Sequence, residues 1–117
     1  MPIWLLLEAN LRFNPSLRST YPQKYRADLL PDGGDLYYGV HFVSPPLEIQ
    51  PGDELLVELM VRAFPEDPCA AFQPGRKVFL KEGSIVRAEG RITRRWERES
   101  AARTVSEFLQ ERSQSLP

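Results

Sequence analysis

The chain has 117 residues, 42% of them hydrophobic, which is enough to bury one core without disulfides or structural metal ions. Its formal net charge of −1 excludes a global attraction to nucleic acid or to an acidic membrane surface, so only local clusters can select a charged partner. The single cysteine, Cys69, excludes an intramolecular disulfide, and without a run of roughly 20 apolar residues for a membrane span we expect a soluble, cytoplasmic protein.

Short apolar runs bounded by proline and glycine predict an all-β chain. In the first run, apolar side chains occupy every second position from Leu5 to Phe13, which is the period of a half-buried strand. The turn Pro51-Gly52-Asp53 leads into the most regular alternation of the chain. The expected strands cover residues 5–13, 24–30, 36–43, 55–63, 77–80 and 85–93.

The last two expected strands form a hairpin around a turn at residues 81–84. On its return strand, Val86, Ala88, Gly90 and Ile92 are expected to face inward. Strands at this spacing, with no helical run between them, favour a closed barrel or a sandwich, and closure also removes exposed strand edges.

The pattern changes after Trp96. Apolar residues then recur at three- and four-residue spacing from Ala101 to Leu109, which predicts a short helix. Its apolar stripe can cover the barrel or dock on a partner, and we favour the barrel because an exposed stripe promotes aggregation. We therefore expect a barrel over residues 1–96 and a C-terminal helix and tail over residues 97–117.

Three stretches, in order along the chain, carry more specific patterns. They are the strand 7–13 with the later run Lys24-Tyr25-Arg26, the turn 51–53, and the hairpin 81–92. Together they resemble the third domain of elongation factor Tu, which implies a six-stranded antiparallel Greek-key barrel. The chain departs from that family at Ala27, where the family has proline, at Ile85 and Val86, where it has an Arg-Thr pair, and at Ala88, where it has glycine.

The resemblance also implies a kind of function. In elongation factor Tu this barrel packs on the GTPase domain and touches the backbone of aminoacyl-tRNA. The chain has no P-loop motif, so we expect no nucleotide site. No acid–base pair, nucleophile constellation or metal cluster is visible in the sequence, so we also expect no cofactor and no enzymatic activity. We expect a non-catalytic module that binds a protein, with translation-associated tRNA binding as the alternative. The candidate contact residues for either partner are Lys24, Tyr25, Arg26, Tyr37, Lys81, Ser84, Arg87, Arg91 and Arg94.

Several residues of this chain have two interpretations. Arg87, Arg91 and Arg94 can form a stripe that contacts phosphates, or a solvated face that is paired with the interleaved glutamates, and we favour the second. Trp4 and Trp96 can stack on bases, or they can plug the barrel ends or pack under the helix, which we favour.

Histidine and cysteine, two residue types that often act in catalysis, occur once each in the chain. His41 has no cysteine or pair of carboxylates at ligand spacing, so we expect neither a metal site nor a general base there. Cys69 lies in a proline-rich loop, and the histidine that would activate it is on a different predicted strand. We therefore expect no catalytic Cys-His pair.

Overall fold

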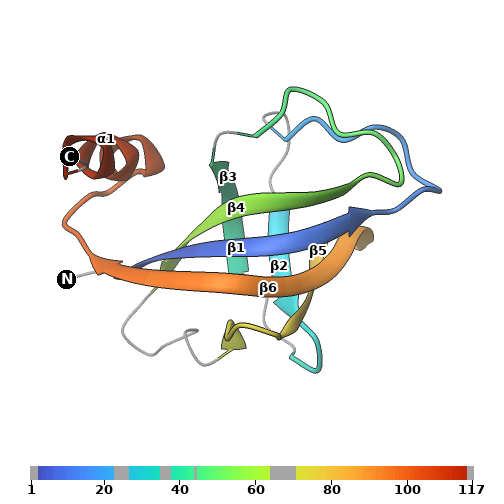
Figure 1. Ribbon diagram of the computed structural model, residues 1–117, viewed down its shortest axis with the longest axis horizontal. Coiled ribbons are helices and arrows are strands. Elements are labelled where there is room, and N and C mark those ends of the chain that lie inside the picture. The colour runs from blue at the N-terminus through green and yellow to red at the C-terminus, as the bar shows by residue number, and fades with distance from the viewer. Residues whose placement is uncertain (1–2, 23–26, 35–37, 44, 64–70, 116–117) are drawn as a thin grey trace.

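Figure 1 shows the computed structural model of the chain, which describes residues 3–22, 27–34, 38–43, 45–63 and 71–115. Six antiparallel strands form a closed barrel in the order β1-β4-β3-β2-β5-β6. The strands β4, β3 and β2 are successive neighbours and β1 lies beside β4, which is the Greek-key arrangement. The elements are β1 (Ile3–Phe13), β2 (Ala27–Pro31), β3 (Tyr38–Val43), β4 (Glu54–Ala63), β5 (Lys77–Glu82), β6 (Ile85–Glu99) and α1 (Val105–Ser115).

This architecture confirms the predicted fold class, and the strand bounds differ mainly at β6. The predicted strand stops at Thr93, but β6 continues to Glu99. The reason is its partner: β1 begins at Ile3, and β6 stays paired with it to the end, with Ile3 opposite Glu99. Of the predicted β2 strand, residues 24–26 lie outside the described residues.

The inner core follows the predicted alternation. Leu5, Leu7, Ala9 and Leu11 of β1 are fully buried in it, together with inward side chains from the other five strands. One inward assignment is wrong, because Val86 is 38% exposed. In the pairing of β5 with β6, Leu80 lies opposite Ala88, but the next residue, Lys81, lies opposite Val86. Arg87 is therefore an extra residue in β6, and it turns Val86 to the outer face.

The strands β1 and β6 approach each other very closely at Gly90. A Cβ atom at this position would overlap the backbone carbonyl of Asn10. Only glycine therefore fits here, which explains why an otherwise apolar inward series is interrupted by a residue with no side chain.

The helix α1 covers the outer face of the sheet where β1 begins and β6 ends (Figure 1). There Phe108 stacks on Trp4, with ring centroids 5.1 Å apart and ring planes 21° apart. Leu6 and Met60 are buried in the same outer cluster. The expectations that the helix docks on its own barrel and that Trp4 packs beneath it are both confirmed. Among the described residues, no helix is long and apolar enough to cross a bilayer.

Trp96 departs from its expected place. It lies opposite Leu6 in the β1–β6 pairing, on the outer face beside the helix, yet 44% of its surface stays exposed. The helix begins at Val105, later than the apolar pattern suggests, because Ala102 belongs to the segment that leads into it. Thr104 caps this helix by accepting a hydrogen bond from the amide of Glu107 at 3.1 Å.

Candidate interaction surface

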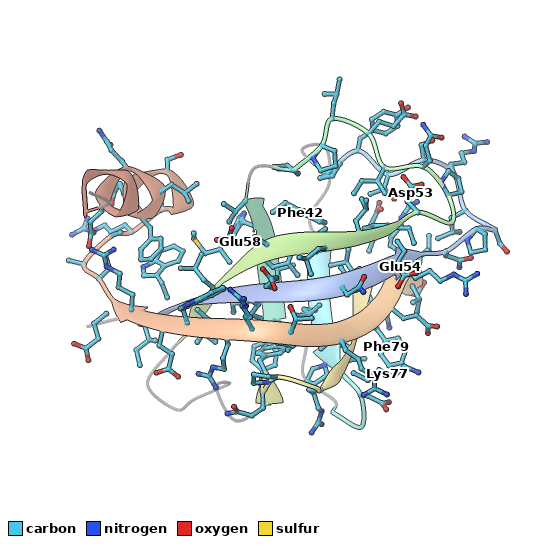
Figure 2. The ribbon with its side chains drawn as sticks, in the orientation of Figure 1. Phe42, Asp53, Glu54, Glu58, Lys77 and Phe79 are labelled. Atoms are coloured by element: carbon cyan, nitrogen blue, oxygen red, sulfur yellow. The ribbon has the colours of Figure 1, made fainter. Side chains whose placement is uncertain are left out.

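The outer face of β4, β1, β6 and β5 is arranged in rows, because cross-strand partners project to the same side. Below the part that α1 covers, the register gives three successive rows. They are Glu58–Glu8–Arg94, Leu56–Asn10–Arg91–Lys77 and Glu54–Arg12–Glu89–Phe79. Figure 2 shows Glu54 and Glu58 along β4, and Lys77 and Phe79 on β5 at the other side of β1 and β6.

The predicted arginine stripe is divided by the bulges of β6. Arg91 and Arg94 share the outer face, whereas Arg87 is the bulged residue and its guanidinium pairs with Glu82 at 2.9 Å. Arg91 donates a hydrogen bond to the carbonyl of Gly75 at 2.8 Å. Arg94 approaches Glu8 at 3.9 Å. Each of the three guanidinium groups thus faces a protein oxygen, but the oxygens named here belong to Glu82, Gly75 and Glu8 rather than to the interleaved glutamates that the sequence suggested.

The other predicted contact residues are spread over the molecule or lie outside the description. Lys81 is at the end of β5, opposite both Val86 and Asp28. Ser84 is in the exposed turn between β5 and β6. The structure therefore joins neither of them to the two rows that hold Arg91 and Arg94. Lys24, Tyr25, Arg26 and Tyr37 fall outside the described residues.

An apolar hollow of about 280 Å³ opens on the outer face between β3 and β4. Leu56, which lines the hollow, is 63% exposed. This feature was missed in the sequence, although Leu56 stands at an outward position between Glu54 and Glu58 of a strand. The hollow is lined by Glu8, Phe42, Val43, Pro45, Pro46, Leu56, Val57 and Glu58.

A second hollow, of about 380 Å³, lies over β1, β5 and β6 and is polar. Basic side chains alternate with acidic ones around it, so it presents no patch of a single sign. Within it, Asn10 donates a hydrogen bond to the Glu54 carboxylate at 3.4 Å. Its lining residues are Asn10, Arg12, Glu54, Lys77, Glu89, Gly90 and Arg91.

A hydrogen bond joins the loop that follows β1 to the loop that precedes β4. The Tyr21 hydroxyl donates to the Glu48 carboxylate at 3.2 Å. Because this bond and the nearby negative charge favour the neutral phenol, the pKa of Tyr21 is raised above its ordinary value of 10.0. Glu48 is thereby held beside the exposed Leu47.

His41 lines neither of these hollows: it is exposed on β3, opposite Met60. Cys69 lies outside the described residues. Within the described ranges no group of three or more histidine, cysteine, aspartate or glutamate side chains could hold a metal ion. No family model, no curated protein and no solved structure matches this chain.

Proposed function

We propose that this chain is a non-catalytic protein-binding module and that its partner docks on the apolar hollow between β3 and β4. One observation carries this proposal. Among the described residues, α1 buries the outer apolar cluster around Trp4 and Phe108. The hollow that Leu56 lines is not covered and stays open to solvent. Exposed apolar patches with a polar rim are typical of protein interaction sites.

We also propose that the barrel is of the elongation factor Tu third-domain type. The Greek-key order of its strands and the hairpin at residues 81–92 support this relation. It fits a binding module, because that barrel serves as a docking platform in the factor. Translation-associated RNA binding has less support, since the guanidinium groups of Arg87, Arg91 and Arg94 each face a protein oxygen.

Affinity capture with surface variants tests the proposed function. Leu56→Lys places a charge at the hollow, whereas Ile85→Lys changes another exposed apolar residue, at the hairpin on the β5–β6 side. Both positions are exposed, so each variant should keep its stability to within about 0.5 kcal/mol. We expect the wild type and Ile85→Lys to retain the same protein from a cytosolic extract and Leu56→Lys to lose it. Recovery of nucleic acid alone, or equal capture by Leu56→Lys, would refute the proposal.

A further inference from the structure

We infer that the partner docks by adding an extended strand to the edge of β4 beside the apolar hollow, with an aliphatic side chain opposite Leu56. This inference rests on the proposed function, because it names the mode of binding at the same site. Three features support it: β3 ends before the β4 strand has been paired along its length, prolines follow in the loop, and Leu56 lies at the edge that is left open.

The pairing of β4 with its two neighbours is unequal in length. With β1 it extends along β4 from Ala63 to Glu54, whereas with β3 it covers only Met60 to Glu58. Figure 1 accordingly shows β3 crossing only the later part of β4. Within the part of the chain that the structure describes, residues 54–57 therefore have β1 on one side and no paired strand on the other.

The direction of the backbone groups follows from the end of the β1–β4 ladder. The amide of Phe13 donates to the carbonyl of Asp53 at 2.8 Å, and the carbonyl of Phe13 accepts from Gly52 at 3.0 Å. Phe13 thus directs both backbone groups toward β4, and this direction alternates along an antiparallel strand. The register then makes Val57 bond to β1. The N–H and C=O of its neighbour Leu56 point the other way, toward the side without a strand.

The loop after β3 cannot complete this edge. If the β3–β4 register continued beyond Val43 and Glu58, Pro45 would lie opposite Leu56. Proline has no N–H, so it cannot donate to the carbonyl of Leu56 as a strand residue would. Within the described ranges, neither backbone group of Leu56 makes a hydrogen bond on this side. These groups are therefore available to the backbone of another chain.

The hollow lies where an added strand would place a side chain. Pro45 and Pro46 of the loop line it, as do Leu56 and Val57 of β4. A residue that pairs with Leu56 projects its side chain to the same outer face, where Leu56 is 63% exposed. An aliphatic side chain there buries apolar surface against Leu56 and the prolines. In strand addition, backbone bonds give affinity and such a side-chain pocket gives specificity.

Amide hydrogen exchange of the free protein tests whether the edge is open. Val57 donates within the β1–β4 ladder and Leu56 does not, so we expect the Leu56 amide to exchange at least about a hundredfold faster than that of Val57. Equal protection of the two amides would refute the inference before any partner is added.

A labelled peptide, Gly-Ser-Thr-Val-Leu-Val-Thr-Ser-Gly, then tests strand addition by fluorescence anisotropy. Its β-branched residues favour an extended chain, and its leucine is placed opposite Leu56. In an antiparallel pair the two leucines exchange both backbone bonds. N-methylation of the peptide leucine should therefore weaken binding by at least about tenfold. N-methylation of the valine that follows it, whose N–H points away from β4, should leave the affinity within about twofold.

Two substitutions at one position locate the bonds on the protein. Leu56→Pro removes the N–H but keeps an apolar side chain, and a strand tolerates proline where the N–H faces away from the ladder. Leu56→Val is the matched control, since it also shortens the side chain but retains the N–H. We expect the peptide affinity to fall by at least about tenfold in Leu56→Pro and by less than about threefold in Leu56→Val. If Leu56→Pro lowers the thermal unfolding midpoint, the N-methylated peptides decide the question, because they leave the protein unchanged.

The outcomes separate this inference from the proposed function. If the peptide does not bind, or binds equally well with its leucine N-methylated, strand addition is refuted, while loss of protein capture in Leu56→Lys would still uphold the docking site. The same holds if a folded Leu56→Pro binds the peptide as tightly as Leu56→Val does. If neither peptide binding nor capture depends on Leu56, both proposals fail.

Discussion

The attachment of α1 to the barrel should depend on a single aromatic side chain. Phe108 is fully buried in the outer cluster, where it stacks on Trp4 and packs with Leu6 and Met60. Phe108→Ala removes this ring and leaves a cavity between the helix and the sheet. The inner core around β1 is a separate cluster, so the substitution should loosen the helix and leave the barrel folded.

The expected magnitude follows from the burial of the ring. Truncation of a buried phenylalanine to alanine costs about 3–5 kcal/mol, which includes about 0.5–1.5 kcal/mol for the stacked aromatic pair. The other attachments given by the described side chains are smaller: Leu109 is partly buried on the same cluster, Ser100 donates to Glu111 at 2.7 Å, and Arg98 pairs with Glu111 at 3.5 Å. An isolated helix of 11 residues is marginal in water. We therefore expect α1 to be substantially undocked and unfolded in Phe108→Ala.

Tryptophan fluorescence can measure this directly. In a Trp96→Phe background Trp4 is the only tryptophan, and it is buried under the helix. Phe108→Ala should shift its emission to longer wavelength and make it accessible to iodide, while Gln110→Ala, on the exposed side of α1, should change neither. Unchanged emission and quenching in Phe108→Ala would refute the argument that this ring holds the helix in place.

Three further predictions concern the backbone, one hydrogen bond and the helix cap. Gly90→Ala should lower the free energy of unfolding by about 3 kcal/mol or more in urea titrations, because the backbone must shift to admit the new Cβ atom. Gly39→Ala is the control: its Cβ atom would meet its nearest neighbour at 3.9 Å, so the free energy of unfolding should change by less than about 1 kcal/mol. The raised pKa of Tyr21 stabilises the folded protein below pH 10.0, and this stabilisation is lost as the pH rises through the pKa of the folded state. Glu48→Gln should lower the pKa of Tyr21, which an absorbance titration measures. Thr104→Ala should cost about 1 kcal/mol through loss of the cap, and an unchanged thermal unfolding midpoint would contradict this.

The fold could be predicted because its signal is local. Alternation from Leu5 to Phe13 and in β4 identifies strands without knowledge of their partners, and all six strands were found at their expected places in the order of the chain. The helix was found for the same reason, because its apolar positions recur at helical spacing. Its docking on the barrel was correctly inferred from the cost of an exposed apolar stripe, and the structure shows that it packs on Trp4.

The candidate site could be predicted only in part. The sequence placed Arg87 and Arg91 on one strand face, with Arg94 as an extension of it, whereas the structure places Arg91 and Arg94 on one face and makes Arg87 the bulged residue. It gave no sign that the partner of Arg91 would be a backbone carbonyl, because Gly75 lies 16 residues away along the chain. The apolar hollow was missed because its walls come from β1, β3, β4 and a loop, which only the folded chain brings together.

The sequence by itself determined the strands, the helix and the all-β class, since these follow from periodicities within short segments, whereas periodicity left a closed barrel and a sandwich both open. Tertiary structure decided which side chains reach the surface. An extra residue in β6 turned Val86 to the outer face, and the length of β1 extended β6 to Glu99. It also decided that Glu8 meets Glu58 beside an open apolar hollow, because cross-strand register is a property of two strands and is written in neither alone.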